Sequence, residues 1–187
     1  MINRMTQQHQ KNITNSFFEL LSFKPINEIS IVNITNKAHI SRRTFYRIFK
    51  NKDDVIDTYI QELLKEYAAW ILELGPQTYD QIIDNFFDYW PKHSEKLKIL
   101  VNADLSYKLL DNANQIFPSI FINFHQTNQN VSWHLDVTNK IEVAYLSRIS
   151  VGIFWNTFTL WLKNPNSISL DKLTHIIKRD LHQIGNY

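Results

Sequence analysis

Two short amphipathic segments joined by a tight turn, within residues 30–49, constrain the fold of this chain more than any other feature. Apolar residues recur in both at helical spacing, so each segment presents one inward face. These residues are Ile31, Ile34 and Ala38 in the first segment and Phe45, Ile48 and Phe49 in the second. Ser30 and Ser41 precede the two segments, where a serine oxygen can accept a hydrogen bond from an unpaired backbone N–H. The pattern predicts a helix–turn–helix.

The second of these segments has a polar, cationic outer face. It consists of Arg42, Arg43, Thr44, Tyr46 and Arg47. A short helix with such a face fits the major groove of DNA. Arg42 or Arg47 is suited to donate two hydrogen bonds to guanine O6 and N7, so we expect this face to read DNA.

At these residues the chain resembles the TetR family of transcription regulators. Residues 38–49, AHISRRTFYRIF, are similar to the family's Ala-Gly-Val-Ser-x-x-Thr-x-Tyr-x-x-Phe recognition segment. Residues 49–55, FKNKDDV, are similar to its entry into a fourth helix. The resemblance covers roughly residues 8 to 65. Two departures stand out: His39 replaces the usual Gly, and Ile48 replaces the usual aromatic residue or His.

The resemblance implies a set of DNA-contacting residues. The set comprises Ser41, Arg42, Arg43, Thr44, Tyr46, Arg47 and Lys52. In the family, the positions of Thr44 and Tyr46 contact phosphates or base edges, and that of Lys52 holds a backbone phosphate. Contacts to phosphate would position the protein, while only those to base edges would specify sequence.

Charge is distributed unevenly along the chain. Through Lys52 there are nine Lys and Arg against two Asp and Glu, whereas the remainder has eleven against sixteen. A cationic head on an acidic body is typical of a phosphate-binding unit carried by a separate scaffold. A basic surface with no partner is the plainer alternative.

The order of apolar and breaker residues predicts an all-α, TetR-like fold with about nine helices. We expect a first helix at 6–22, the helix–turn–helix at about 30–49, and a long fourth helix at 52–74 that ends at Gly75-Pro76. Further helices are expected at 77–90, 94–102, 104–126, 137–163 and 169–184. We divide the chain into a DNA-binding head, 1–52, and a helical ligand-binding and dimerisation domain, 53–187, with the family-type domain spanning about 6–66.

The body is rich in aromatic residues among which the family has its ligand pocket. The candidates are Phe86, Trp90, Phe117, Phe121, Trp133 and Trp155. Aromatic residues at helical spacing are more often plain core. An apolar pocket with few polar groups would suit a hydrophobic or aromatic ligand.

The helix expected around 141–162 is the most apolar part of the body. Glu142, Arg148 and Asn156 interrupt it, so a membrane span is not expected. A helix that is apolar on more than one side can face both its own core and a second subunit. Family members dimerise through their last two helices, and the interface candidates here are Gly152, Phe154, Phe158, Trp161 and Leu162.

Enzymatic motifs are not found in the sequence. It has no Gly-rich phosphate loop, no Gly-x-Ser-x-Gly elbow and no His-Glu-x-x-His. His93, His125 and His134 lack the spacing of a helix-borne metal pair, so we expect no metal and no cofactor. The absence of cysteine and of an apolar leader in the first residues favours a cytoplasmic protein.

These observations predict a homodimeric, sequence-specific DNA-binding regulator, most simply a repressor that binds an inverted-repeat operator and is released by a small hydrophobic or aromatic ligand. The alternative is a TetR-like regulator without a ligand that acts through a protein partner, as an activator or interaction module. A cavity in the body would favour the first, and a packed body with an exposed apolar patch would favour the second.

Overall fold

The structure, a computed structural model, describes residues 4–75, 78–127 and 136–184, and these residues form nine α-helices and two short 3-10 helices. In chain order these are α1 (Arg4–Leu21), η1 (Ile26–Glu28), α2 (Ile31–Lys37), α3 (Arg42–Ile48), α4 (Lys52–Leu74), α5 (Tyr79–Tyr89), η2 (Trp90–His93), α6 (Ser94–Asn102), α7 (Ser106–Thr127), α8 (Lys140–Lys163) and α9 (Leu170–Ile184). The predicted all-α class with about nine helices is confirmed.

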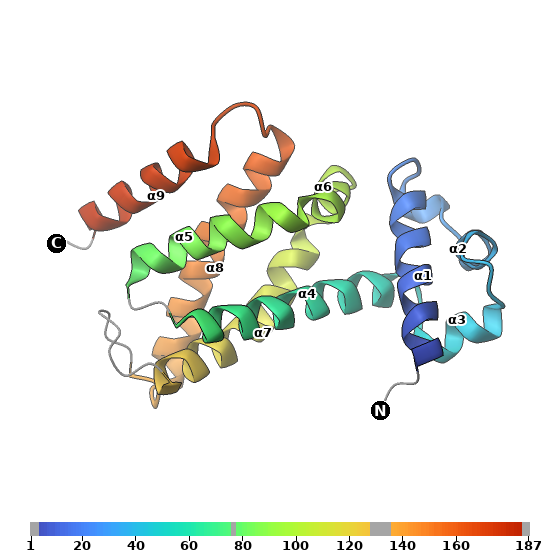
Figure 1. Cartoon of the computed structure of the whole chain (residues 1–187), viewed down its shortest axis with the longest axis horizontal. Coiled ribbons are helices and arrows are strands. Elements are labelled where there is room, and N and C mark those ends of the chain that lie inside the picture. The colour runs from blue at the N-terminus through green and yellow to red at the C-terminus, as the bar shows by residue number, and fades with distance from the viewer. Residues whose placement is uncertain (1–3, 76–77, 128–135, 185–187) are drawn as a thin grey trace.

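Helices α1, α2 and α3 form a head at one end of the molecule (Figure 1). Their buried side chains belong to one core: Ile13, Phe17, Phe18, Leu21, Ile34, Ala38, Phe45 and Phe49. Phe17 and Phe18 pack edge to face, with ring centroids 5.7 Å apart. Burying such aromatic side chains is the main stabilisation available to a head this small.

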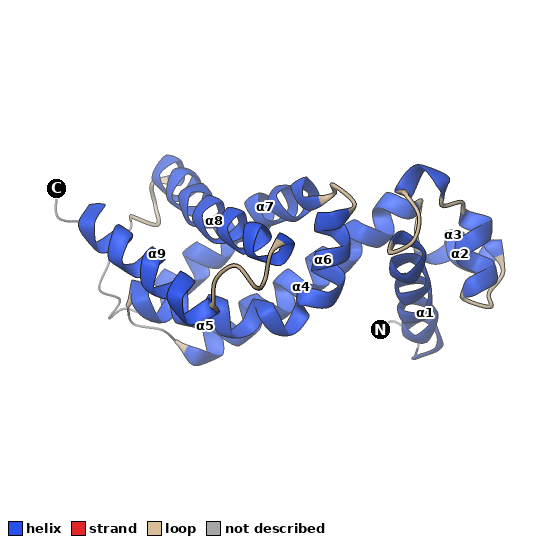
Figure 2. Ribbon diagram, turned by 90° about the horizontal axis from the view of Figure 1, so that it is seen from above, coloured by secondary structure: helices blue, strands red, loops and turns tan. Residues whose placement is uncertain are grey.

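Helix α4 leads from the head into the body, and a perpendicular view places α2 and α3 at the opposite end of the molecule from α9 (Figure 2). Asn51 caps its start by accepting a hydrogen bond from the N–H of Asp54 at 2.8 Å. Gly75 ends it in the left-handed conformation, with φ of 56°. The division of the chain predicted at residue 52 therefore falls where α4 begins, and it stays a prediction.

The body consists of α5 to α9 packed around the far part of α4. Helix α8 packs against α7 and α6, and α9 lies beside α5 (Figure 1). Within the described part of the chain, no helix is long and apolar enough to cross a membrane.

Capping residues set several helix starts later than the sequence predicted. Thr78 forms a capping box with Gln81, so α5 starts at Tyr79 instead of 77. Asn139 accepts hydrogen bonds from two backbone N–H groups, so α8 starts at Lys140 instead of 137. Asp104 has a φ of 57°, which a helical residue cannot adopt, so α7 starts at Ser106 instead of 104.

Candidate nucleic-acid interface and effector pocket

The turn between α2 and α3 is built on His39, whose φ of 53° lies in the left-handed region. The N–H of Ile40 donates to the carbonyl of Thr35 at 3.0 Å, and the N–H of His39 donates to that of Asn36 at 3.3 Å. These two bonds form a Schellman motif, which usually has glycine at its left-handed position. Because histidine enters this conformation more readily than most residues, the turn closes without the family's glycine.

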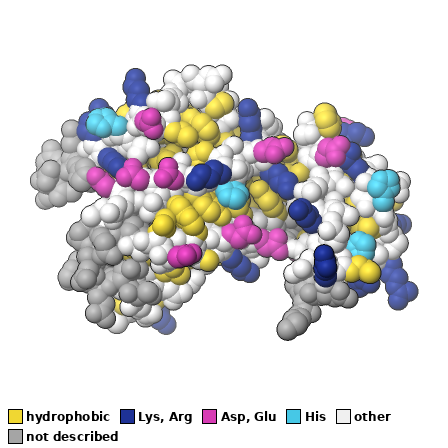
Figure 3. Space-filling view, in the orientation of Figure 1, with side chains coloured by type: hydrophobic (Ala, Val, Ile, Leu, Met, Phe, Trp, Pro, Cys, Tyr) yellow, Lys and Arg dark blue, Asp and Glu magenta, His cyan; other side chains and the backbone are white. Residues whose placement is uncertain are grey.

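Helix α3 exposes its cationic side chains while Phe45 holds its other side in the head core. Phe45 is fully buried, Tyr46 is 51% exposed, and Arg42, Arg43 and Arg47 are exposed as well. Since successive helical residues are about 100° apart, the four exposed residues cover one arc of about 140°. This α3 face is a continuous surface of hydrogen-bond donors, and Lys and Arg side chains appear along the outer edge of the head in Figure 3.

Ser41 and Thr44 set where α3 begins. The N–H of Thr44 donates to Oγ of Ser41 at 3.0 Å, and the two hydroxyl oxygens are also 3.0 Å apart. Ser41 is exposed and Thr44 is half-buried. Both residues therefore lie next to the α3 face, and the structure gives them a capping role.

Lys52, for which the family resemblance implies a phosphate contact, bonds to the head in this structure. Its Nζ donates to the backbone carbonyls of Ile26 and, at 3.1 Å, Ile29. These carbonyls belong to the segment between α1 and α2, so the ammonium group ties the start of α4 to the head. The predicted phosphate contact would require Lys52 to leave both carbonyls, and it stays a prediction beside this structural role.

Two further long-range polar contacts, which the sequence did not predict, hold α1 and α4 against the body. Lys96 of α6 donates to Oδ1 of Asn15 in α1 at 2.7 Å, and its ammonium lies 5.2 Å from the ring centroid of Tyr59. Asn112 of α7, which is buried, donates to Asp57 of α4 at 3.2 Å. Such long-range pairs have no signature in local spacing.

The predicted ligand residues fall into two groups. Phe86, Trp90 and Trp155 are at most 2% exposed and pack against one another, with centroids of the two indoles 4.5 Å apart. These three residues form the first group and belong to the core in this structure. Phe117 and Phe121 form the second group and line a pocket. Trp133 lies outside the described residues.

The pocket lies between α4, α5 and α7 and has a volume of about 40 Å³. Its lining is almost wholly apolar: Tyr67, Ile71, Ile82, Phe117, Ile120, Phe121, Phe124 and His125. Burial raises the pKa of Tyr67, and burial lowers the pKa of His125, so both are uncharged at neutral pH. This apolar pocket has room for about one water molecule.

The predicted dimer residues are mostly turned inward. Phe154, Phe158 and Leu162 are at most 3% exposed within the single chain, because Phe86 of α5 packs on both phenylalanine rings and α6 and α7 pack against α8. They are corrected from interface to core residues. Trp161 is half-buried and donates its indole N–H to the carbonyl of Ile168 at 3.3 Å.

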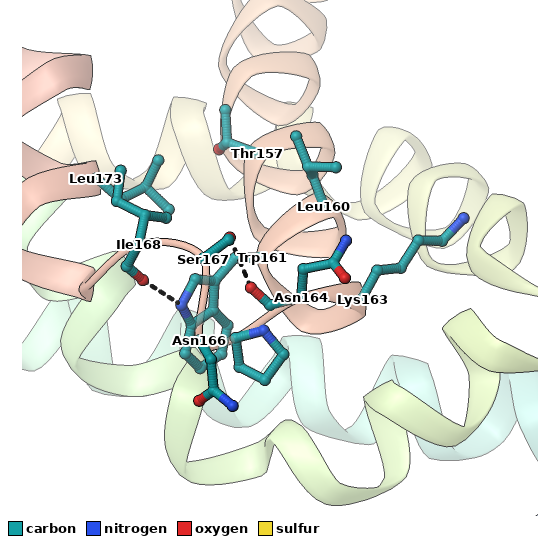
Figure 4. Close-up of a pocket in the computed structure, with 10 residues that line it drawn as sticks. Thr157, Leu160, Trp161, Lys163, Asn164, Asn166, Ser167, Ile168 and Leu173 are labelled. Atoms are coloured by element: carbon teal, nitrogen blue, oxygen red, sulfur yellow. Dashed lines mark hydrogen bonds between the residues drawn. The ribbon is translucent and has the colours of Figure 1, made fainter.

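An open groove of about 680 Å³ lies at the connection between α8 and α9. Figure 4 shows Trp161 at the connection, with its bond to Ile168, and Leu160 and Leu173 on the two helices. Leu160 is 66% exposed. The groove therefore adjoins the exposed side of α8 and lies far from the α3 face.

Elsewhere in residues 4–75, 78–127 and 136–184, no three His, Asp or Glu side chains gather closely enough to hold a metal ion. His93 stacks on Tyr89 with centroids 4.5 Å apart. Burial lowers the pKa of His93 and, with the charge of Glu66, raises that of Tyr89 to about 12. Both side chains are therefore neutral at pH 7.

Together the helix–turn–helix head, the long α4 and the helical body define an all-α fold of the TetR type. No family model matches the chain, and no curated protein matches its sequence. Among solved structures, the fatty acid degradation regulator FadR from Bacillus halodurans matches with a TM-score of 0.61 at 14% identity, over 91% of this chain and 93% of that one. The transcriptional regulator FadR from Bacillus subtilis, in complex with stearoyl-CoA, matches with a TM-score of 0.58 at 19% identity, over 89% and 94%. At such identities the likeness concerns the fold, and the predicted TetR-like fold is confirmed.

Proposed function

We propose that this chain is a sequence-specific DNA-binding transcriptional regulator, acting as a homodimeric repressor that a small hydrophobic molecule releases from DNA. The observation that carries the proposal is the α3 face. Arg42, Arg43, Tyr46 and Arg47 form one exposed arc on a short helix anchored by buried Phe45. The role is a binding role and needs no catalytic group.

The test begins by selecting bound DNA from a random pool to define the operator. Arg42→Ala and Arg47→Ala are then measured on it. A base-reading arginine should lose about 1–3 kcal/mol of binding free energy and relax preference at one base pair. Arg179→Ala is the matched control, because Arg179 is exposed on α9 and pairs with its neighbour Asp180. Wild-type affinity in both α3 variants would refute the proposed surface.

The exposed side of α8 supports the proposed dimer. Ile141, Tyr145, Ile149 and Leu160 are 71%, 69%, 54% and 66% exposed. At about 100° per residue they fall within an arc of about 100°, which also holds the exposed Asn156, so they form a largely apolar stripe. Exposed apolar patches on a protein surface are typical of interfaces. A second copy suits it, because isologous pairing covers the same stripe on both chains.

Gly152 lies in the middle of this stripe. A Cβ added at this position would lie 4.0 Å from Nδ2 of Asn156. No other described side chain or loop would lie as close to it. Glycine inside a helix costs about 1 kcal/mol relative to alanine, and packing within the chain does not require it. In the proposed dimer, the missing side chain of Gly152 lets a partner's α8 approach closely.

The dimer is tested by light scattering at micromolar concentration. Gly152→Leu and Ile149→Arg should shift the protein toward monomer, since one blocks close approach and the other places a charge in the stripe. Leu74→Arg, at an exposed leucine near the end of α4, should remain dimeric. A monomeric wild type would rule the dimer out.

The effector part of the proposal is supported by the apolar pocket and by the neighbour's ligand. The Bacillus subtilis regulator was solved with stearoyl-CoA, a molecule with a long aliphatic chain. The pocket here is too small for such a chain, so a ligand must move Tyr67 or Phe117 to enter. Tyr67 belongs to α4, whose other end carries the head, so this movement would change the position of α3.

Linkage gives this mechanism a direct test. A tenfold weakening of DNA binding by ligand corresponds to about 1.4 kcal/mol of coupling, and DNA must weaken ligand binding by the same factor. Calorimetric titration of a ligand with and without operator measures both sides. Equal affinities in the two titrations would exclude that ligand as an effector.

The packed aromatic core favours a second candidate, a regulator without a small-molecule ligand that acts through a protein partner. In this case the α8 stripe is the docking surface. Co-purified partner protein and unchanged DNA binding across a hydrophobic ligand set would support the second candidate over the first.

A further inference from the structure

The aromatic core contains two polar groups that the packing leaves unsatisfied. The indole N–H groups of Trp90 and Trp155 are fully buried, and neither has a hydrogen-bond partner among the residues that the structure describes. By contrast, Trp161, which lies on the same helix as Trp155, donates its indole N–H to the carbonyl of Ile168. A buried donor without an acceptor is costly, and native proteins retain few of them.

The two indoles lie directly behind the apolar pocket. Tyr67, which lines the pocket, has its ring centroid 5.1 Å from that of Trp90. Trp90 in turn is 4.5 Å from Trp155. Tyr67 therefore touches both the pocket and the Trp90 ring. A molecule that enters from the pocket and takes the place of the Tyr67 ring would contact Trp90, with Trp155 beside it.

The surroundings of the two indoles decide which acceptor they can take. The rings that pack on them, apart from each other, are those of Tyr67, Phe86, Tyr89 and Phe158. None of these four side chains is a cation. The carboxylate of Glu66 is close enough to Tyr89 to add to the burial that raises the pKa of Tyr89. A buried carboxylate or phosphate would lose its hydration without a cation to replace it.

We infer that the pocket behind Tyr67 binds an uncharged, chain-like apolar molecule whose carbonyl oxygen accepts hydrogen bonds from Trp90 and Trp155. A carbonyl oxygen has two lone pairs and so can serve both donors. The apolar chain occupies the pocket between α4, α5 and α7. This deepens the effector part of the proposed function and rests on it for its regulatory meaning.

The experiment uses the full-length protein without DNA and three ligands of equal chain length: tridecane, 2-tridecanone and tridecanoate. Each displaces the neutral fluorescent probe N-phenyl-1-naphthylamine, and affinities are corrected for solubility in water. The ketone should bind about tenfold more tightly than the alkane, the scale expected of two added hydrogen bonds. It should also bind more tightly than the carboxylate, which finds no cation.

Trp90→Phe and Trp155→Phe keep an aromatic ring but remove the donor, so each should reduce the preference for the ketone over the alkane. Trp161→Phe is the matched control, because its indole N–H already has a partner, and it should retain the preference. Equal binding of ketone and alkane by the wild type would overturn the inference. The inference would also be overturned if the preference for the ketone were as large in both core variants as in the wild type.

A second measurement needs no variant. In wild-type protein with ¹⁵N-labelled tryptophan, the ketone should move two indole N–H resonances downfield, as new hydrogen bonds do, and tridecane should not. Ketone binding without such movement would refute the inference. If the ketone binds as expected but leaves DNA affinity unchanged, the site stands and the proposed effector role fails.

Discussion

The ammonium group of Lys108 in α7 lies 3.2 Å from the carboxylate of Asp53 and 3.4 Å from that of Asp57, both in the first turns of α4. Lys108 is only 12% exposed. Burial alone lowers the pKa of Lys108, but the hydrogen bonds and charges of Asp53 and Asp57 more than offset this and hold it above its usual value. One charged lysine of the body therefore holds the end of α4 that carries the head.

Replacing Lys108 with Met should loosen this end of α4. We expect a stability loss of about 1 kcal/mol, since Asp53 stays solvated and Asp57 keeps its bond to Asn112. Amide hydrogen exchange in the first turns of α4 should become faster. Lys178→Met is the matched control, because Lys178 pairs with Asp84 across α9 and α5 at 2.5 Å. Equal exchange of the α4 amides in the two variants would contradict this role of Lys108.

Lys52→Met should destabilise the head. The carbonyls of Ile26 and Ile29 would lose a charged donor, which costs about 1–3 kcal/mol. Thermal unfolding measures this loss, and Lys50→Met, at an exposed lysine just before α4, should show little of it. The salt dependence of DNA binding provides the second readout. A fall of about one unit in its slope would support the predicted phosphate contact, and an unchanged slope would contradict it.

His39 can be tested through its backbone conformation. Because its φ is 53°, a β-branched side chain at this position is strained, and His39→Val should lower the free energy of unfolding by about 1–2 kcal/mol. His39→Gly relieves the strain but adds freedom to the unfolded chain, so it should change stability by less than about 1 kcal/mol. Denaturant titration compares the two variants. Equal stability of the Val and Gly variants would show that the turn does not hold this conformation in solution.

Two half-buried histidines, His93 and His125, should make the fold sensitive to mild acid. Burial lowers the pKa of His93, with Lys92 adding to this and Glu66 opposing it, and burial also lowers the pKa of His125. Below the ordinary pKa of 6.5, the unfolded chain takes up protons that the folded chain does not. The free energy of unfolding should therefore fall as the pH drops below about 6.5, and level off below the folded pKa values.

Thermal unfolding at a series of pH values from 7.5 to about 5 measures how stability depends on pH and so tests this prediction. The double variant His93→Phe and His125→Phe should lose part of the acid sensitivity. His175→Phe, at an exposed histidine of α9, should retain it. An unchanged pH profile in the double variant would show that other groups cause the acid response.

The helices of this chain were predictable because their signals are local. Ser30, Ser41 and Asn51 each accept a backbone hydrogen bond at a helix start, as their positions before apolar segments indicated. The burial of Phe45 and the exposure of its arginine neighbours follow from helical periodicity in the same way. The starts of α5 and α8 were predicted too early because Thr78 and Asn139 act as caps, and that of α7 because Asp104, a residue other than glycine, is left-handed.

What the sequence determined by itself is thus the set of helices, the helix–turn–helix and the cationic face of α3, since all three depend on residues within a few positions of one another. The direction of Lys52 depends on carbonyls more than twenty residues away. On α8, apolar side chains occur all round, and the packing of α5, α6 and α7 decides that Phe154 faces the core while Ile149 faces solvent. Periodicity identifies a face of a helix, but which neighbour covers that face is a property of the assembled chain.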